Sequence, residues 1–126
     1  MTQVTNFEKV GDFMEACDQE ILTEPAFPDE DTINLRLRLI QEELDELFFA
    51  HEDNDLVEVA DALTDLLYVI YGTGQAYGID LDACFDEVHE SNMSKLVDGY
   101  AQKNEIGKVM KGPNFFPPNL RSVLGL

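Results

Sequence analysis

The stretch Val57–Gly72, VEVADALTDLLYVIYG, decides the fold, because it is apolar at most positions and nevertheless carries Glu58, Asp61 and Asp65. On an α-helix of about 3.6 residues per turn, these three acids share one narrow stripe, and aliphatic side chains cover most of the rest. Such a helix is predicted to lie centrally, with neighbours on most sides. A buried carboxylate is normally protonated, paired with a cation or bound to a metal, so one of these arrangements is expected here.

Helical spacing of apolar residues predicts the other elements of the chain. The connection HEDND between the second and third helices is short, so these helices are expected to be antiparallel neighbours. The C-terminal residues, rich in Gly, Pro and Asn, predict a mostly irregular tail that packs through Phe115, Phe116 and Leu120. We therefore predict a single all-α domain over residues 1–126, a four-helix bundle with an irregular C-terminal tail. The predicted helices span about residues 6–20, 32–51, 55–77 and 81–96.

Side chains that accept backbone hydrogen bonds are expected at the helix starts. Asp31 or Thr32 is predicted to cap the second helix, Asn54 or Asp55 the third, and Asp80 the fourth. The main apolar face of the second helix is predicted to be Ile33, Leu37, Ile40, Leu44, Leu47 and Phe48. The inward stripe of the fourth is predicted to begin with Leu81, Phe85 and Val88.

The overall charge limits the classes of partner. The chain has 26 acidic and 8 basic residues and a formal net charge of -18, which disfavours nucleic acid and anionic membrane surfaces. The longest apolar run is too short to span a bilayer. Cys17 and Cys84 lack a CxxC pattern and lie among apolar neighbours, so we interpret them as reduced core residues and expect a cytoplasmic protein.

Two pairs of acids with the same three-residue spacing lie on the second and third predicted helices. Glu43 and Glu46 flank the apolar stripe of one helix, and Glu58 and Asp61 lie on the other, so the pairs can meet across an antiparallel interface. Residues 42–65 contain ten acids and neither Lys nor Arg, so local ion pairing cannot neutralise them. Carboxylate oxygens are the ligands that Mg²⁺ and Mn²⁺ prefer, which indicates a metal site. The alternative for the second helix is a solvated acidic face.

These acids form the pattern EELDE at residues 42–46 followed, after eleven residues, by EVAD at residues 58–61. The pattern resembles the EExxE…ExxD signature of the all-α nucleoside triphosphate pyrophosphohydrolases, the superfamily of MazG, dimeric dUTPases and phosphoribosyl-ATP pyrophosphohydrolase. The strings RLRLIQEELDEL, VHESNMSKLVDG and GKVMKGPNFFPPNL are similar to a short, single-domain, phage-type MazG-like branch. Together they cover most of residues 35–120, so the expected bundle is a MazG-like one.

The resemblance implies an enzyme that cleaves a nucleoside triphosphate to the monophosphate and pyrophosphate with Mg²⁺, for which Mn²⁺ can substitute. The metal ligands that it implies are Glu43, Glu46, Glu58 and Asp61. Glu46 would accept the proton of the attacking water. Glu42, the first acid of the motif, would orient water or a ligand side chain, or face solvent. Asp65, one turn beyond Asp61, would bind a water outside the ligand set.

Four polar residues near the C-terminus are expected to meet the substrate. Asn92 and Lys95 continue the inward stripe of the fourth helix, where Asn92 would orient the nucleotide and Lys95 would contact a phosphate. The alternative for Lys95 is a side chain that passes the helix end into solvent. Lys108 and Lys111, flanked by glycines, either close over the triphosphate or only balance the acidic surface.

Other features have structural interpretations. Gly72 and Gly74 form a Gly-x-Gly without a preceding strand or a following GK[ST], so a P-loop is excluded and close helix packing is expected. Phe13 and Phe27 are interpreted as core residues rather than as stacking surfaces for a base.

The resembling branch suggests purine deoxynucleotides, dGTP or dATP, as substrates, with a role in nucleotide-pool control. A dUTPase-like or broad house-cleaning activity is the nearest alternative. Two hypotheses from other classes are an acidic binding module, such as a DNA mimic, and a MazG-like regulator that binds nucleotide without cleaving it. The resembling families are dimers or dimers of dimers, so a homodimer or homotetramer is expected, in the host cytoplasm if the chain is phage-encoded.

Overall fold

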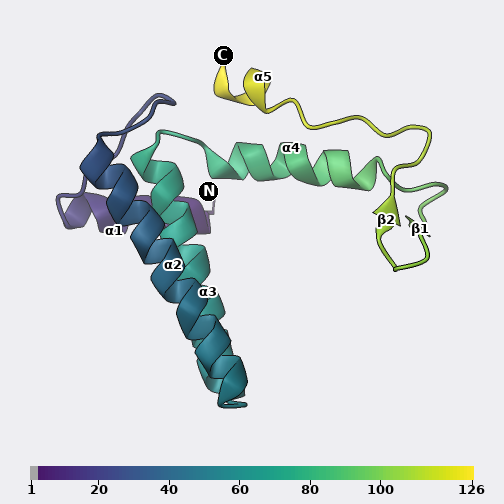
Figure 1. The fold of residues 1–126 in the computed structure, drawn as a ribbon. Helices are drawn as coiled ribbons and strands as arrows, with labels where there is room; N and C mark the ends of the chain where they lie inside the picture. Colours follow the sequence, from purple (N-terminus) through teal and green to yellow (C-terminus); the bar gives the residue numbers. More distant parts are fainter. Residues whose placement is uncertain (1–2) are drawn as a thin grey trace. The chain divides into compact units, whose positions relative to one another are not determined.

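The computed structural model describes residues 3–126 and confirms the all-α class (Figure 1). Its main helices are α1 (Asn6–Ala16), α2 (Glu30–Glu52), α3 (Leu56–Ala76) and α4 (Leu81–Met93). The chain divides into two compact units, a first one that ends at Ile79 and a second one, Asp80–Leu126. A single domain over residues 1–126 stays a prediction.

Aspartates cap the two long helices of the first unit. Asp29 caps α2, because its carboxylate accepts a hydrogen bond from the Thr32 backbone N at 2.7 Å. The predicted cap at Asp31 or Thr32 is therefore wrong, since the helix already begins at Glu30. Asp55 caps α3, as predicted, and its carboxylate accepts hydrogen bonds from two backbone N–H groups of the first turn.

Small residues allow α3 to pack closely on its neighbours. The buried residues of α3 are Ala62, Gly72, Gly74 and Ala76. A Cβ atom at Gly72 would collide with the Arg36 guanidinium of α2, which confirms that Gly72 serves close packing. On another side, α1 packs against α3 around a core of Val10, Met14 and Ala76. The α2–α3 contact is the more extensive of the two and positions the site described below.

The apolar stripe predicted for α2 is only partly covered. Its members Ile33, Ile40, Leu44 and Leu47 are half-buried, but Leu37 and Phe48 are 55% and 62% exposed, and the buried residues of α2 are Arg36 and Ala50. The prediction that α3 has neighbours on most sides is also wrong within the described chain, because several of its large apolar side chains are exposed. These are Leu56, Val57, Leu63 and Leu67. The glycines of α3 leave little space between the two helices. Small or flexible side chains of α2 fit there better than branched ones.

The second unit contains α4, a short antiparallel hairpin and a terminal helix. The bounds of the last three elements are Gln102–Lys103 for β1, Val109–Met110 for β2 and Leu120–Leu124 for α5. Asp80 caps α4, as predicted, and accepts a hydrogen bond from the Ala83 backbone N at 3.1 Å. The helix ends at Met93, so the prediction that Lys95 continues its stripe is wrong. The Ser94 hydroxyl donates to the Ser91 carbonyl at 2.6 Å where the helix ends.

The tail confirms the predicted irregular segment, apart from the hairpin and α5, but it covers an unexpected face of α4. The Ser91 hydroxyl donates to the Phe116 carbonyl at 2.9 Å, and the Asn119 backbone N donates to Glu87 at 2.9 Å. Phe85, from the predicted inward stripe, is 72% exposed. Within this unit the tail therefore packs on the side of α4 that carries Glu87 and Ser91, because these side chains form hydrogen bonds with its backbone groups.

The two cysteines differ in environment, and both are free thiols. Cys84 is buried, as predicted, and burial raises the pKa of its thiol. Cys17 is exposed, so its prediction as a core residue is wrong: α1 ends at Ala16 instead of continuing to about residue 20. Within residues 3–126, no helix combines the length and the apolar character needed to cross a membrane.

Candidate metal centre

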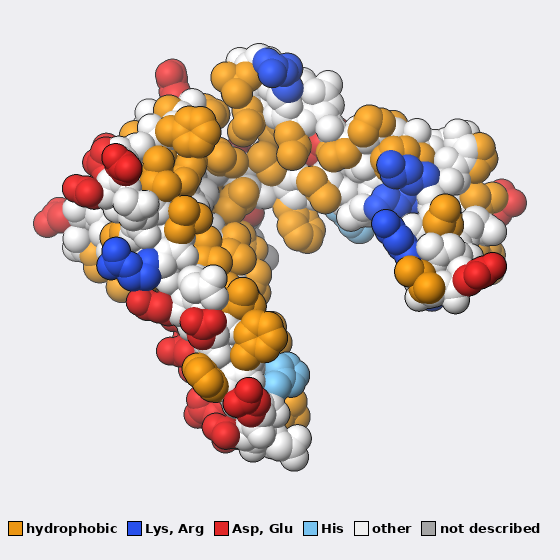
Figure 2. Space-filling model, in the orientation of Figure 1, with side chains coloured by type: hydrophobic (Ala, Val, Ile, Leu, Met, Phe, Trp, Pro, Cys, Tyr) orange, Lys and Arg blue, Asp and Glu red, His pale blue; other side chains and the backbone are white. Residues whose placement is uncertain are grey.

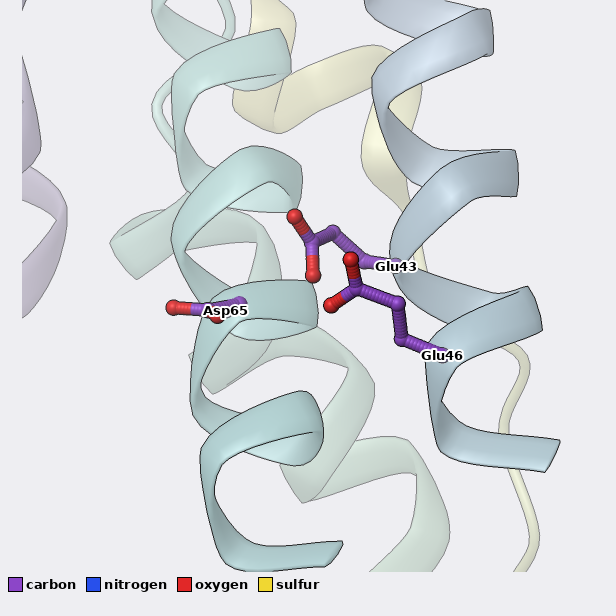
Figure 3. Close-up of side chains that lie close together, drawn as sticks. All are labelled: Glu43, Glu46 and Asp65. Atoms are coloured by element: carbon purple, nitrogen blue, oxygen red, sulfur yellow. The ribbon is translucent and has the colours of Figure 1, made fainter. Parts of the chain in front are cut away.

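Three carboxylates meet between α2 and α3. Glu43 and Glu46 lie one turn apart on α2 and extend toward α3, and Asp65 comes from the facing part of α3 (Figure 3). One oxygen atom of each side chain lies within 4.8 Å of the others. The antiparallel arrangement expected from the short HEDND connection brings these side chains together.

Glu43 is the least satisfied member of this carboxylate cluster. Its Oε2 atom is buried and has no hydrogen-bond partner among residues 3–126. Burial raises the pKa of Glu43 from 4.5 to about 7, and the hydrogen bond and charge of Glu46 and the charges of Asp65 and Asp61 act in the same direction. Burial likewise raises the pKa of Asp65, with contributions from Asp61 and Glu46. The cluster therefore needs either a proton or a cation near neutral pH.

The cluster fits a hard divalent cation. Its three donors are all carboxylates, and one of their oxygens is buried without a partner. Residues 42–65 offer no Lys or Arg that could neutralise them locally. Mg²⁺ and Mn²⁺ prefer such oxygen ligands, and Mg²⁺ usually binds through one or two carboxylates together with waters and substrate phosphates.

A pocket of about 410 Å³ opens beside the cluster and contains the remaining predicted ligands. Its walls are formed by Glu46, Phe49, Ala50, Asp53, Glu58, Asp61 and Ala62. Glu46 belongs to both the cluster and the pocket, so Glu58 and Asp61 share a wall with it. These three acids are exposed, and the burial expected from the sequence is seen only at Glu43 and Asp65, which are half-buried.

The structure gives Asp65 a different role from the predicted one and places Glu42 at the surface. Asp65, which was expected to bind only an outer water, supplies the α3 carboxylate of the cluster. Its position on the same helical stripe as Glu58 and Asp61 was the sequence signal for this role. Glu42 is exposed, which agrees with the predicted alternative that it faces solvent, and it belongs neither to the cluster nor to the pocket walls.

The predicted substrate-binding residues lie in the second unit. Figure 2 shows acidic side chains over the first unit and a group of basic side chains around the hairpin of the second unit. Lys111 lies over the Phe115 ring, 4.8 Å from its centroid, and the Lys108 backbone N donates to Asn104 at 2.9 Å. Asn92 is exposed and Lys95 half-buried. The roles of Asn92, Lys95, Lys108 and Lys111 in substrate binding stay predictions.

Comparison with known proteins adds family evidence. The sequence model of the family described as phosphoribosyl-ATP pyrophosphohydrolase matches residues 10–92, a segment that contains all the acids of the cluster and the pocket. An uncharacterized protein of Acanthamoeba polyphaga mimivirus is 43% identical over 84 residues, which are 64% of this chain and 34% of the relative. The chain thus spans about a third of the length of this curated relative.

Proposed function

Because this chain belongs to the phosphoribosyl-ATP pyrophosphohydrolase family, we propose that it is a Mg²⁺-dependent enzyme that hydrolyses a nucleoside triphosphate to the monophosphate and pyrophosphate. The observation that carries the proposal is the buried, unpartnered Oε2 of Glu43 within a cluster of three carboxylates. A cation bound in place of a proton would satisfy this oxygen. The open pocket beside it has room for a polyphosphate.

In this proposal the metal ligands are Glu43, Glu46, Glu58 and Asp61, with Asp65 added from the geometry. Bound Mg²⁺ would neutralise phosphate oxygens and lower the pKa of the attacking water. Glu46 faces both the cluster and the pocket, so we assign to it the acceptance of the water proton. Glu43 and Asp65 would hold their side of the site in a half-buried position where water competes less. Glu42 has no role in this assignment, because it is exposed and does not line the pocket.

The proposed substrates are purine deoxynucleotides, dGTP or dATP, in nucleotide-pool control. The viral source of the relative supports a role in the cytoplasm of an infected cell. The exposed apolar side chains of α2 and α3 support a homodimer or homotetramer. Lys95, Lys108 and Lys111 remain the proposed phosphate contacts, and Asn92 the residue that orients the nucleotide.

An acidic binding module is the second candidate, and it is favoured by the exposure of Glu46, Glu58 and Asp61. Incubation with each dNTP, dUTP included, and Mg²⁺ tests the enzyme directly, by quantifying dNMP and pyrophosphate. Glu58→Ala should abolish turnover while the circular-dichroism melting curve is retained. Asp45→Ala, at an exposed acid of α2 that accepts a hydrogen bond from Gln41, is the matched control and should keep turnover. Nucleotide binding without product would instead identify a regulator, and the absence of both metal and nucleotide binding would identify a binding module.

A further inference from the structure

A buried arginine forms the second polar feature of the α2–α3 interface. Arg36 is only 5% exposed, and its guanidinium lies against Gly72. Its Nε donates to the Thr73 hydroxyl at 3.3 Å and its Nη2 to the Val69 carbonyl at 2.9 Å. Both acceptors are uncharged, so these bonds hold the guanidinium without neutralising it. Burial of this unneutralised charge lowers the pKa of Arg36.

Arg36 lines a cavity of about 130 Å³ between α1 and the α2–α3 pair. The other residues that matter here are Phe13, Gln19, Leu39 and Tyr68. A neighbouring cavity of about 150 Å³ shares Arg36 and Gln19 with it. Pockets for drug-sized ligands span roughly 300–1,000 Å³, so the first cavity suits a single planar ring system rather than a whole nucleotide.

Aromatic surface is available at this cavity. Phe13 and Tyr68 form an edge-to-face pair with ring centroids 5.8 Å apart and an interplanar angle of 78°. They are 52% and 40% exposed, so the prediction that Phe13 is a core residue is wrong. Exposed ring faces next to a buried cation provide a stacking surface and a polar group that fixes orientation.

The cavity adjoins the carboxylate cluster along both helices. On α2, Leu39 precedes Glu43 by four residues, and on α3, Tyr68 follows Asp65 by three. Each separation is about one helical turn, or roughly 5 Å along the axis. One ligand can therefore place a ring in the cavity and its phosphates at the carboxylates.

We propose that this cavity binds the base of the triphosphate and that Arg36 selects guanine over adenine, an inference that rests on the proposed function. A guanidinium offers only donors, and those that Thr73 and Val69 do not use remain available for the acceptors of a ligand. Guanine presents two adjacent acceptors, O6 and N7, whereas adenine presents the N6 amino donor at the same edge. The exposed Gln19 amide, able to donate and accept, completes the polar side of the cavity.

Phe13→Ala tests whether the cavity binds a base, with Phe27→Ala as the matched control. Phe27 is also exposed, so its prediction as a core residue is wrong as well. It pairs edge-to-face with a tyrosine, Tyr77, at 6.0 Å, but it does not line the cavity. Phe13→Ala should lower kcat/KM for dGTP at least about fivefold, mainly through KM, because stacking is lost. Phe27→Ala should leave it unchanged. Equal effects of the two substitutions would overturn the assignment.

Arg36→Gln tests the choice of base. The wild type should prefer dGTP, and the variant should shift the dGTP to dATP ratio of kcat/KM about tenfold or more toward dATP, because a Gln amide matches adenine. A proportional loss for both substrates would show that Arg36 only holds the helices together, and would refute the proposal. If this variant fails to fold, Gln19→Ala at the exposed amide must shift the same ratio for the proposal to stand.

Metal-free binding separates this inference from the proposed function. Titration of dGMP and dAMP in EDTA, followed by NMR shifts of the Phe13 and Tyr68 rings, should show tighter binding of dGMP. A wild-type protein that releases no pyrophosphate but binds dGMP at these rings would refute the proposed hydrolysis and keep the base site. Hydrolysis without base preference, and with no ring shifts, would keep the function and refute the base site.

Discussion

Two sites along the α2–α3 interface hold opposite charges and satisfy them differently: Arg36, called the arginine end, and the Glu43, Glu46 and Asp65 cluster, called the acidic end. Arg36 is buried and donates hydrogen bonds to the Thr73 hydroxyl and the Val69 carbonyl. Seven residues further along α2, Glu43 has a buried oxygen for which the described part of the chain offers no hydrogen-bond partner. Seven residues of α-helix span roughly 10 Å, which is too far for the guanidinium to neutralise the carboxylate.

The arginine end has protein acceptors for two of its hydrogen bonds, whereas the acidic end has a buried oxygen with no donor among the described residues. Neutral oxygens of α3 can accept hydrogen bonds from Arg36 while it stays charged. Neighbouring carboxylates repel one another, and only a proton or a cation relieves Glu43. Substitutions at the acidic end should therefore respond to divalent metal, whereas substitutions at the arginine end should not.

The largest effect is expected from Glu46→Gln, which removes a ligand oxygen and the proposed proton acceptor. The value of kcat/KM for pyrophosphate release should fall by roughly 100-fold to 10,000-fold. Asp45→Asn, at an exposed neighbour that does not face the cluster, is the control and should stay near the wild type. If the turnover of Glu46→Gln stays within a few-fold of that of the wild type, the acidic end has no catalytic role.

The carboxylates of the acidic end should make the stability of the protein depend on pH. The folded-state pKa of Glu43 is raised from 4.5 to about 7, so the folded state binds the proton more tightly than the unfolded state. The free energy of unfolding of the metal-free protein should therefore fall as pH rises from about 4.5 to 7, with Asp65 acting in the same direction. Glu43→Gln should remove much of this fall in urea denaturation series. Added Mg²⁺ should stabilise the wild type more at pH 8 than at pH 5 and should stabilise Glu43→Gln less.

The helices and the acidic end could be anticipated from sequence, because local patterns determine them. The aspartates that cap α3 and α4 and the three-residue spacing of the acid pairs are local signals. The short connection then makes α2 and α3 antiparallel, which is sufficient to bring Glu43 and Glu46 near Asp65. Periodicity was only partly right for α2, where Leu37 and Phe48 of the predicted stripe are exposed, because an apolar stripe shows which side of a helix can be buried but not which residues cover it.

The arginine end could not be anticipated, because it depends on a long-range fit. Nothing near Arg36 in the sequence distinguishes it from the exposed Arg38. Its burial follows from the missing side chain of Gly72, 36 positions later, and from the Thr73 hydroxyl beside it. Such a pairing between distant residues becomes visible only when α2 and α3 are packed together.

Gly72→Ala should destabilise the protein at the arginine end. The new methyl group would displace the Arg36 guanidinium and its hydrogen bond to Val69. Replacing Gly inside a helix gains about 0.5–1 kcal/mol, but hydrogen bonds of a charged group contribute about 1.5–3 kcal/mol, so a net loss of about 1–2 kcal/mol is expected. Urea denaturation measures it. In an Arg36→Met background the same substitution should no longer destabilise, and a loss of equal size there would show that the guanidinium is not the cause.

Thr73→Val should have the smallest effect on the free energy of unfolding. It tests directly whether the arginine end depends on the acidic end. Thr73 and Thr64 both donate their hydroxyl to the carbonyl four residues earlier, at 2.7 Å, but only Thr73 also accepts a hydrogen bond from Arg36. Valine keeps the shape and removes this acceptor, so Thr73→Val should cost about 1 kcal/mol more than Thr64→Val in denaturant unfolding. The difference should be independent of Mg²⁺, because the hydrogen bond between Arg36 and Thr73 does not involve the carboxylate cluster. A difference that disappears when Mg²⁺ is added would mean that the two ends are coupled rather than independent.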